Sequence, residues 1–189
     1  MLGWCAFGAA VGAQASLAMG QGVPAFNQPL TSPMAGLRAR FGTAVAVSEK
    51  TAIVGAPGDT SAGADAGAVH VFLREELSGA FNVSQELRPG AVGPFDRFGE
   101  AIAIGGNLLV VGAKGDDVAA PNAGAVYVFR RFGFASPFQL EAKLVAPNGG
   151  ISDGFGASVA VLGDKIAVGA PRADETAFDA GTVYTYTFD

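Results

Sequence analysis

The sequence has little of the material from which most catalytic and metal sites are built. Its 189 residues include one cysteine, Cys5, and one histidine, His70, and only 15% of the residues are charged. A single cysteine excludes a disulfide within the chain, so the fold must be held together by packing. The sequence also lacks a Gly-x-Ser-x-Gly turn, a His/Cys pair, a metal-spaced histidine cluster and a phosphate-binding glycine loop. We therefore expect no catalytic residues and no enzyme.

Basic residues are also scarce. The chain has 12 Lys and Arg against 17 Asp and Glu, which gives a net charge of −5. Proteins that bind nucleic acid usually present basic surface to the phosphates, so this balance argues against a nucleic-acid partner. The low charge, the 28 glycines and the short apolar runs are typical of a protein with many strands and turns rather than of a disordered one.

Charge is absent altogether from residues 1–20, which are apolar and rich in alanine and glycine. This stretch resembles a secretory signal peptide, although no Lys or Arg precedes its apolar run. A membrane anchor, a buried N-terminal segment and a misplaced start codon are the alternatives. The interruptions by Gly and Gln14 and the short length favour a signal peptide. On this interpretation residues 21–189 are the mature domain, and the protein is secreted, displayed on the cell surface or periplasmic, with no membrane span.

What the sequence does contain is a long internal repeat, which is the mark of a repeat architecture. A Phe-Gly pair begins at Phe41 and returns 57 residues later at Phe98 and again 57 residues later at Phe155. The units cover about residues 24–80, 81–137 and 138–189. The recurring motif residues are Phe41, Gly42, Gly55, Ala56 and Pro57, then Phe98, Gly99, Gly112 and Ala113, then Phe155, Gly156, Gly169, Ala170 and Pro171.

Each unit is predicted to hold four strands, in the order of a polar outer strand, a Phe-Gly strand, a Gly-Ala-Pro strand and an aromatic strand. In the Phe-Gly strand of the first unit Val45 and Val47 alternate with Ala44 and Ala46, and the other units keep this period of two. Neither face is polar, so the strand should be buried on both sides, as in a sheet stacked between two others. The polar outer strands are expected at residues 81–87 and 138–144, with a weaker version at 26–30.

The motifs Phe-Gly, Gly-Ala-Pro and Ala-Gly-x-Val-Tyr-x-Phe, in three concordant copies, resemble the FG-GAP repeat. The resemblance covers about residues 24–188 and implies the β-propeller of integrin α subunits and of many secreted or cell-surface microbial proteins. The implied fold is all-β, a propeller-like array of three four-stranded antiparallel blades. The sequence departs from the family motif at two places. Arg38-Ala39-Arg40 precedes Phe41, and Lys114 stands in the place of the motif proline.

The resemblance suggests calcium as a possible cofactor. Integrin-like repeats carry an Asp-x-Asp-x-Asp-Gly loop, because Ca²⁺ needs six to eight oxygen ligands. The corresponding segments here, 48–50, 105–107 and 163–165, are too short and offer at most one carboxylate each. We therefore predict no metal site and no cofactor, and leave open only weak Ca²⁺ contact at other acidic loops.

Acidic residues gather instead in the loops that follow the Gly-Ala-Pro strands. They could form a ligand-binding face, or they could serve ordinary Asp and Asn turn chemistry at a solvated rim, which is the interpretation that we favour. The candidates are Asp59, Asp65, Asp116, Asp117, Asp174, Glu175 and Asp179. His70 alternates with valines on a predicted strand, so we expect it to be packed or at the rim rather than to act as a base.

These observations favour a non-enzymatic, secreted or cell-surface binding or adhesion module that holds protein or glycan through loops at one end of the blades. One alternative is a secreted propeller enzyme, a hydrolase or lyase that acts on carbohydrate or ester through the acidic loops. Another is a set of structural blades that assembles with a partner.

The number of units bears on whether the chain associates with further blades. Closed propellers typically have about four to eight blades, whereas this sequence contains three units. We expect self-association, most simply two chains in a six-bladed ring, or docking onto further blades, unless the sequence is part of a longer propeller.

Overall fold

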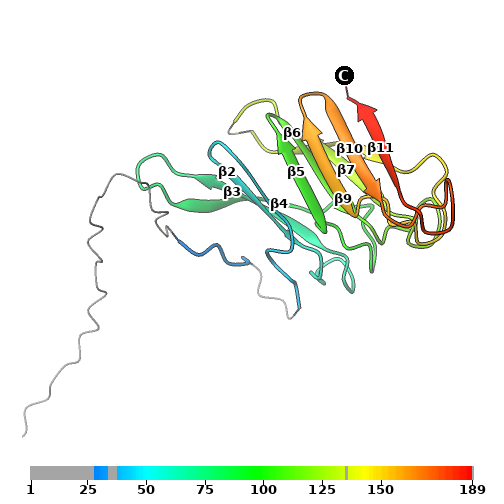
Figure 1. The fold of residues 1–189 in the computed structure, drawn as a ribbon. Coiled ribbons are helices and arrows are strands. Elements are labelled where there is room, and N and C mark those ends of the chain that lie inside the picture. The colour runs from blue at the N-terminus through cyan, green and yellow to red at the C-terminus, as the bar shows by residue number, and fades with distance from the viewer. Residues whose placement is uncertain (1–27, 34–37, 135, 189) are drawn as a thin grey trace, which may run out of the picture.

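The computed structural model describes residues 28–33, 38–134 and 136–188, and these residues form three antiparallel sheets. The expected signal peptide lies outside the described residues. The first sheet contains β1 (Val45–Ser48), β2 (Thr51–Ala56), β3 (Ala68–Arg74) and β4 (Phe81–Leu87). The second contains β5 (Ala101–Gly105), β6 (Leu108–Ala113), β7 (Ala125–Arg130) and β8 (Gln139–Leu144). The third contains β9 (Ser158–Leu162), β10 (Lys165–Ala170) and β11 (Thr182–Thr187). The sheets follow one another like blades (Figure 1), which confirms the all-β, propeller-like prediction.

Short hairpins fix the first two strands of each sheet. In the first sheet Ser48 pairs with Thr51, which leaves Glu49 and Lys50 as a two-residue turn. The first turn residue has a positive φ in every sheet, 50° at Glu49, 58° at Gly106 and 59° at Gly163. Two-residue turns of this kind match the right-handed twist of the strands that they join, so they set the register.

The fourth strand of a sheet comes from the following repeat. β4 opens the second sequence unit, yet it pairs with β3 of the first sheet, from Val69 opposite Leu87 to Arg74 opposite Phe81. β8 pairs with β7 in the same way. The prediction that each polar strand belongs to the blade of its own Phe-Gly strand was therefore wrong. The periodicity cannot show which neighbour an outer strand joins, whereas the short connection of residues 75–80 makes a β3–β4 hairpin.

The third sheet has three strands among the described residues rather than the predicted four. Its order is β11-β10-β9, and β11 has a strand partner on one side only within this part of the chain. The two four-stranded sheets agree with the prediction.

The core lies between the sheets, around the phenylalanines of the Phe-Gly pairs. Phe98 and Phe155 are fully buried. The Phe98 ring meets Tyr127 edge to face at 5.3 Å between centroids, and the Phe155 ring lies 5.4 Å from Tyr184. Phe41 packs on its own sheet in the same way but stays half-buried, because no sheet of the described residues lies beyond it.

The Phe-Gly strands differ in how much of them is covered. β5 is half-buried along its whole length between the two flanking sheets. β1 exposes Val45 and Val47, at 69% and 71%, and β9 exposes Leu162 at 82%. The prediction that all three strands are buried on both faces was therefore met only in part by β5, which is covered but half-buried, and was wrong for β1 and β9, since the described sheets form an open row.

Two of the glycines that recur in the Gly-Ala-Pro position, Gly55 and Gly112, mark where neighbouring sheets touch through their backbones. A Cβ atom at Gly55 would lie 2.1 Å from the carbonyl oxygen of Gly99, and one at Gly112 would lie 2.0 Å from that of Gly156. Backbone atoms cannot rotate away as a side chain can, so no side chain fits at either position. The recurring glycines therefore set the spacing between the sheets.

All the regular elements of the described residues are strands. None of the residues that the structure describes forms a helix long and apolar enough to cross a membrane.

Candidate functional site

Two of the acidic candidates, Asp59 and Asp116, are buried and act inside the fold. The carboxylate of Asp116 lies 2.7 Å from Lys143 Nζ and accepts hydrogen bonds from the Tyr127 hydroxyl and the Val118 amide, both at 3.0 Å. Asp59 is the equivalent residue of the first unit and lies 3.1 Å from the Arg88 guanidinium. These carboxylates join a loop to the outer strand of the same sheet. They are not presented to a ligand.

The remaining acidic candidates lie nearer the surface and mostly shape the loops. Asp117 accepts a hydrogen bond from the Asn122 amide at 2.7 Å, and Asp174 accepts one from the Asp179 amide at 2.6 Å. Asp65 and Asp179 have φ values of 48° and 52°, in the left-handed region that Asp and Asn tolerate best. This is turn geometry at equivalent places in successive loops.

Glu175 is an exposed acidic candidate that accepts hydrogen bonds from two side chains. Its Oε1 accepts hydrogen bonds from the Tyr184 hydroxyl at 2.7 Å and from the Asn148 amide group at 2.5 Å. The hydrogen bonds from Tyr184 and Asn148 lower the pKa of Glu175, and burial together with Glu175 raises the pKa of Tyr184 to about 12. Within the described ranges no three His, Cys, Asp or Glu side chains come close enough together to hold a metal ion.

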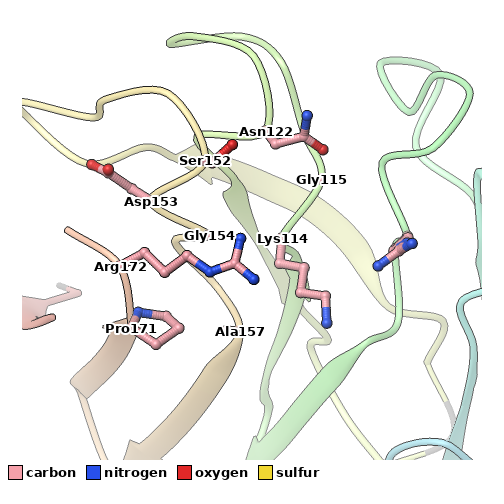
Figure 2. Close-up of a pocket in the computed structure, with 10 residues that line it drawn as sticks. Lys114, Gly115, Asn122, Ser152, Asp153, Gly154, Ala157, Pro171 and Arg172 are labelled. Atoms are coloured by element: carbon pink, nitrogen blue, oxygen red, sulfur yellow. The ribbon is translucent and has the colours of Figure 1, made fainter. Parts of the chain in front are cut away.

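The structure also contains a pocket with the opposite charge. A cavity of about 410 Å³ opens between the loops of the second and third sheets, and three cationic residues line it: Arg97, Lys114 and Arg172. Figure 2 shows the side chains of Lys114 and Arg172 directed into the same space from adjacent sheets. Asn122, Ser152 and one carboxylate, Asp153, also line it.

Each cation is placed by a feature of the repeat. Lys114 directly follows β6 in the position of the motif proline, and Arg172 follows Pro171 after β10. Arg97 is held in a left-handed turn, with a φ of 57°, just before Phe98. Lys114 forms a 2.6 Å ion pair with Glu100. Arg97 and Arg172 form no ion pair with any described residue. These two guanidinium groups outnumber the one carboxylate of the lining, Asp153, so the pocket keeps a net positive charge.

Sequence reasoning missed this pocket because it searched for features that the repeats share. Two of the cations are residues by which the repeats differ. Lys114 stands where the other units have Pro57 and Pro171, and Arg172 stands where they have Gly58 and Gly115. A comparison of the units position by position would have found both.

The comparisons with known proteins agree with the motifs. A family model described as the FG-GAP repeat matches residues 28–72, 82–129 and 138–186. The chain belongs to the FG-GAP repeat family. Such repeats are found in integrin-like adhesion and binding modules. No curated protein matches the chain.

Among solved structures, the FG-GAP chain is similar to the "Crystal structure of the computationally designed Ika4 protein". The identity is 17%, the match covers 87% of this chain and 100% of that chain, and the TM-score is 0.40.

One position in the FG-GAP repeats breaks the pattern of the aromatic strand. His70 occupies the place of Tyr127 and Tyr184, and it is fully buried. Among the described residues neither of its ring nitrogens has a hydrogen-bond partner, and Nδ1 lies 3.7 Å from Glu86. Burial lowers the pKa of His70 below 6.5, against the opposing influence of Glu86. The structure therefore holds a neutral imidazole inside the first sheet.

We expect the substitution His70→Tyr to flatten the pH dependence of stability. The unfolded chain protonates His70 at a higher pH than the folded chain does, so the wild type loses stability as the pH falls below about 6.5. The tyrosine does not titrate in this range. Urea unfolding at pH 7 and pH 5 measures the difference, with Tyr127→Phe as the control. An equal loss of stability in His70→Tyr and wild type would contradict the assignment.

Proposed function

We propose that this FG-GAP chain is a non-enzymatic, secreted or cell-surface binding module that holds an anionic group of its ligand in the basic pocket. The observation that carries the proposal is the convergence of Arg97, Lys114 and Arg172 in a protein whose net charge is −5. The ligand is a glycan or protein that presents a carboxylate or sulfate.

The chemistry of the pocket supports an anion. Arg97 and Arg172 have no ion-pair partner among the described residues, and their like charges repel each other, so a bound anion would offset charge that the fold leaves uncompensated. Guanidinium groups suit carboxylates and sulfates, since their planar donors can form two hydrogen bonds to one oxyanion. The volume of about 410 Å³ lies within the usual range of small-molecule pockets and suits one sugar ring or one side chain. Acidic surface elsewhere would repel a long polyanion, so a short anionic segment fits best.

The same residues argue against a hydrolase or lyase. The acidic candidates that could act as a catalytic pair are engaged in ion pairs and hydrogen bonds of the fold, as Asp59 and Asp116 show. His70 is buried and has no access to a ligand. Secretion rests on the character of residues 1–20 in the sequence.

We expect Arg172→Ser to weaken binding of an anionic ligand at least tenfold, since one charge-assisted hydrogen bond contributes about 1.5–3 kcal/mol. The measurement is titration calorimetry against oligosaccharides that carry uronic acid or sulfate groups, and against acidic peptides. Arg74→Ser is the matched control, because Arg74 is an exposed cation outside the pocket.

The affinity for acidic oligosaccharides should exceed that for neutral ones, and added salt should weaken the binding of the acidic ones only. If Arg172→Ser and Arg74→Ser bound every probe with the affinity of the wild type, the basic pocket would not be the binding site.

A further inference from the structure

The structure contains the same sheet-to-sheet junction twice. At the first, the Phe98 amide donates to the Ala66 carbonyl at 2.9 Å, and Phe98 pairs in parallel with Gly67. At the second, the Phe155 amide donates to the Ala123 carbonyl at 2.8 Å. One sheet supplies the Phe-Gly turn and its preceding residues, and the neighbouring sheet supplies the Ala-Gly segment.

The leading half of a third junction is already shaped ahead of the first sheet. Arg38 and Arg40 have φ values of 67° and 53°. Their counterparts at the first junction, Phe95 and Arg97, have 68° and 57°. Four residues other than glycine thus hold a left-handed conformation that such residues rarely adopt, at the same two places of the repeat. The segment before Phe41 therefore has the docked shape in the absence of a partner.

The receiving half is shaped at the other end. Asp179 and Gly181 have φ values of 52° and 77°, close to the 48° and 93° of Asp65 and Gly67, which do receive a Phe-Gly turn. In the structure no described segment pairs with Gly181 as Phe98 pairs with Gly67.

A cavity that could accommodate a Phe-Gly turn lies beside this receiving half. A cavity of about 620 Å³ on the outer face of the third sheet is lined by Gly169, Gly181 and Val183, among others. The equivalent residues of the first sheet are Gly55, Gly67 and Val69. Gly55 and Gly67 contact the backbone of Gly99 and Phe98 so closely that a Cβ atom at either would lie 2.1 Å from a carbonyl oxygen.

The apolar side chains at the two outer faces also match. Val45 and Val47 are exposed on β1, whereas their equivalents Ile102 and Ile104 pack into the core of the neighbouring sheet. A second cavity, of about 420 Å³, lies on the outer face of the third sheet where such residues would pack. Its lining includes Ala160, Leu162, Ala167 and Thr185.

The hydrogen bonds of the outer strands also repeat between the internal junction and the free leading end. Gln85 of β4 donates to the Phe138 carbonyl and accepts from its amide, both at 2.8 Å, just before β8. Gln28 makes the same pair of bonds to Phe81, at 3.1 and 2.9 Å. Gln28 is therefore placed as Gln85 is on β4, that is, as part of the outer strand of a sheet that would precede the first one. β11 is the strand that lacks such an outer neighbour among the described residues.

We propose that two copies of this chain dock head to tail, so that each third sheet receives Phe41-Gly42, Val45 and Val47 of the other copy, and the segment around Gln28 lies along the partner's β11. The register of β4 on β3 places Leu30 opposite Val183. A head-to-tail contact must close or grow into a fibre, and two copies supply six sheets, within the usual range of closed propellers.

The receiving face is more polar than its internal equivalents. Lys165 and Thr185 stand where the second sheet has Leu108 and Val128. The junction between copies is therefore weaker than the internal ones, and it exchanges while each copy stays folded.

Light scattering behind size exclusion tests the proposal at micromolar concentration, with two variants that each damage one half of the junction. Val47→Asp damages the leading face and Val183→Asp the receiving face. We expect twice the chain mass for the wild type, and a twofold lower mass for either variant alone. Leu77→Asp is the control, since Leu77 is exposed in the β3–β4 connection. Circular dichroism establishes that each variant is folded.

Mixing the two variants gives the sharper result. The mixture retains one intact junction, between the receiving face of Val47→Asp and the leading face of Val183→Asp, so dimers should return. A monomeric wild type, a mixture that stays monomeric, or open-ended assemblies larger than the dimer would each overturn the proposal.

Discussion

Replacing Phe98 with alanine is expected to lower the free energy of unfolding by about 3–5 kcal/mol, the usual cost of a large-to-small core change. The Phe98 side chain is fully buried between the first and second sheets. Its ring meets Tyr127 and Phe129 at centroid distances of 5.3 and 6.1 Å. The cavity would lie beside a backbone junction that cannot collapse to fill it, so we expect the upper part of this range.

Urea unfolding at a fixed protein concentration measures the effect, because association would otherwise alter the apparent stability. Phe132→Ala is the matched control, since Phe132 is 78% exposed and should tolerate the change. A Phe98→Ala protein with wild-type stability and impaired ligand binding would show that Phe98 is a ligand platform and not a core residue.

Asp116→Ala is expected to cost a similar amount, about 3–5 kcal/mol, because it removes one member of a buried ion pair. Lys143 Nζ would lose the carboxylate that lies 2.7 Å away, and the Tyr127 hydroxyl would lose its acceptor. The lysine charge would then remain in a site that is largely closed to water, which is the main source of the cost.

Asp117→Ala is the neighbouring control. Asp117 is exposed and makes a single loop hydrogen bond, so its loss should be several times less costly. Thermal unfolding and ligand titration are measured together on both variants. If Asp116→Ala stayed fully stable and lost ligand binding, the buried carboxylate would be a binding residue after all.

The sequence predicted the strands well because the alternation of Val45 and Val47 with small residues, and the turn at Glu49, act locally. Local rules of this kind determine strand type, hairpin register and the place of Phe98 in the core. The membership of β4 was predicted wrongly because an outer strand is polar on its solvent face and matches either neighbouring sheet equally well. The short connection before Phe81 decides the pairing.

The basic pocket could not be read from the motifs for a different reason. Arg97, Lys114 and Arg172 come from separate segments of two repeats, and only the stacking of the second and third sheets brings them together. The acidic loops were visible in the sequence, but burial separates Asp116 from Asp117 although the two are adjacent. Composition cannot show which of two neighbouring carboxylates points inward.

The origin of β4 in the following repeat bears on how the nascent chain folds. When Arg74 leaves the ribosome, β3 still presents a bare edge, and it stays bare until Leu87 has been synthesised. At rates of about 5–20 residues per second this interval lasts on the order of one second, during which the edge could template pairing with another chain. The immediate hairpin from β3 to β4 keeps this exposure short, and the mostly exposed side chains of β4 face solvent once it has paired. The second and third repeats therefore each supply the strand that covers the exposed edge of the sheet translated before them.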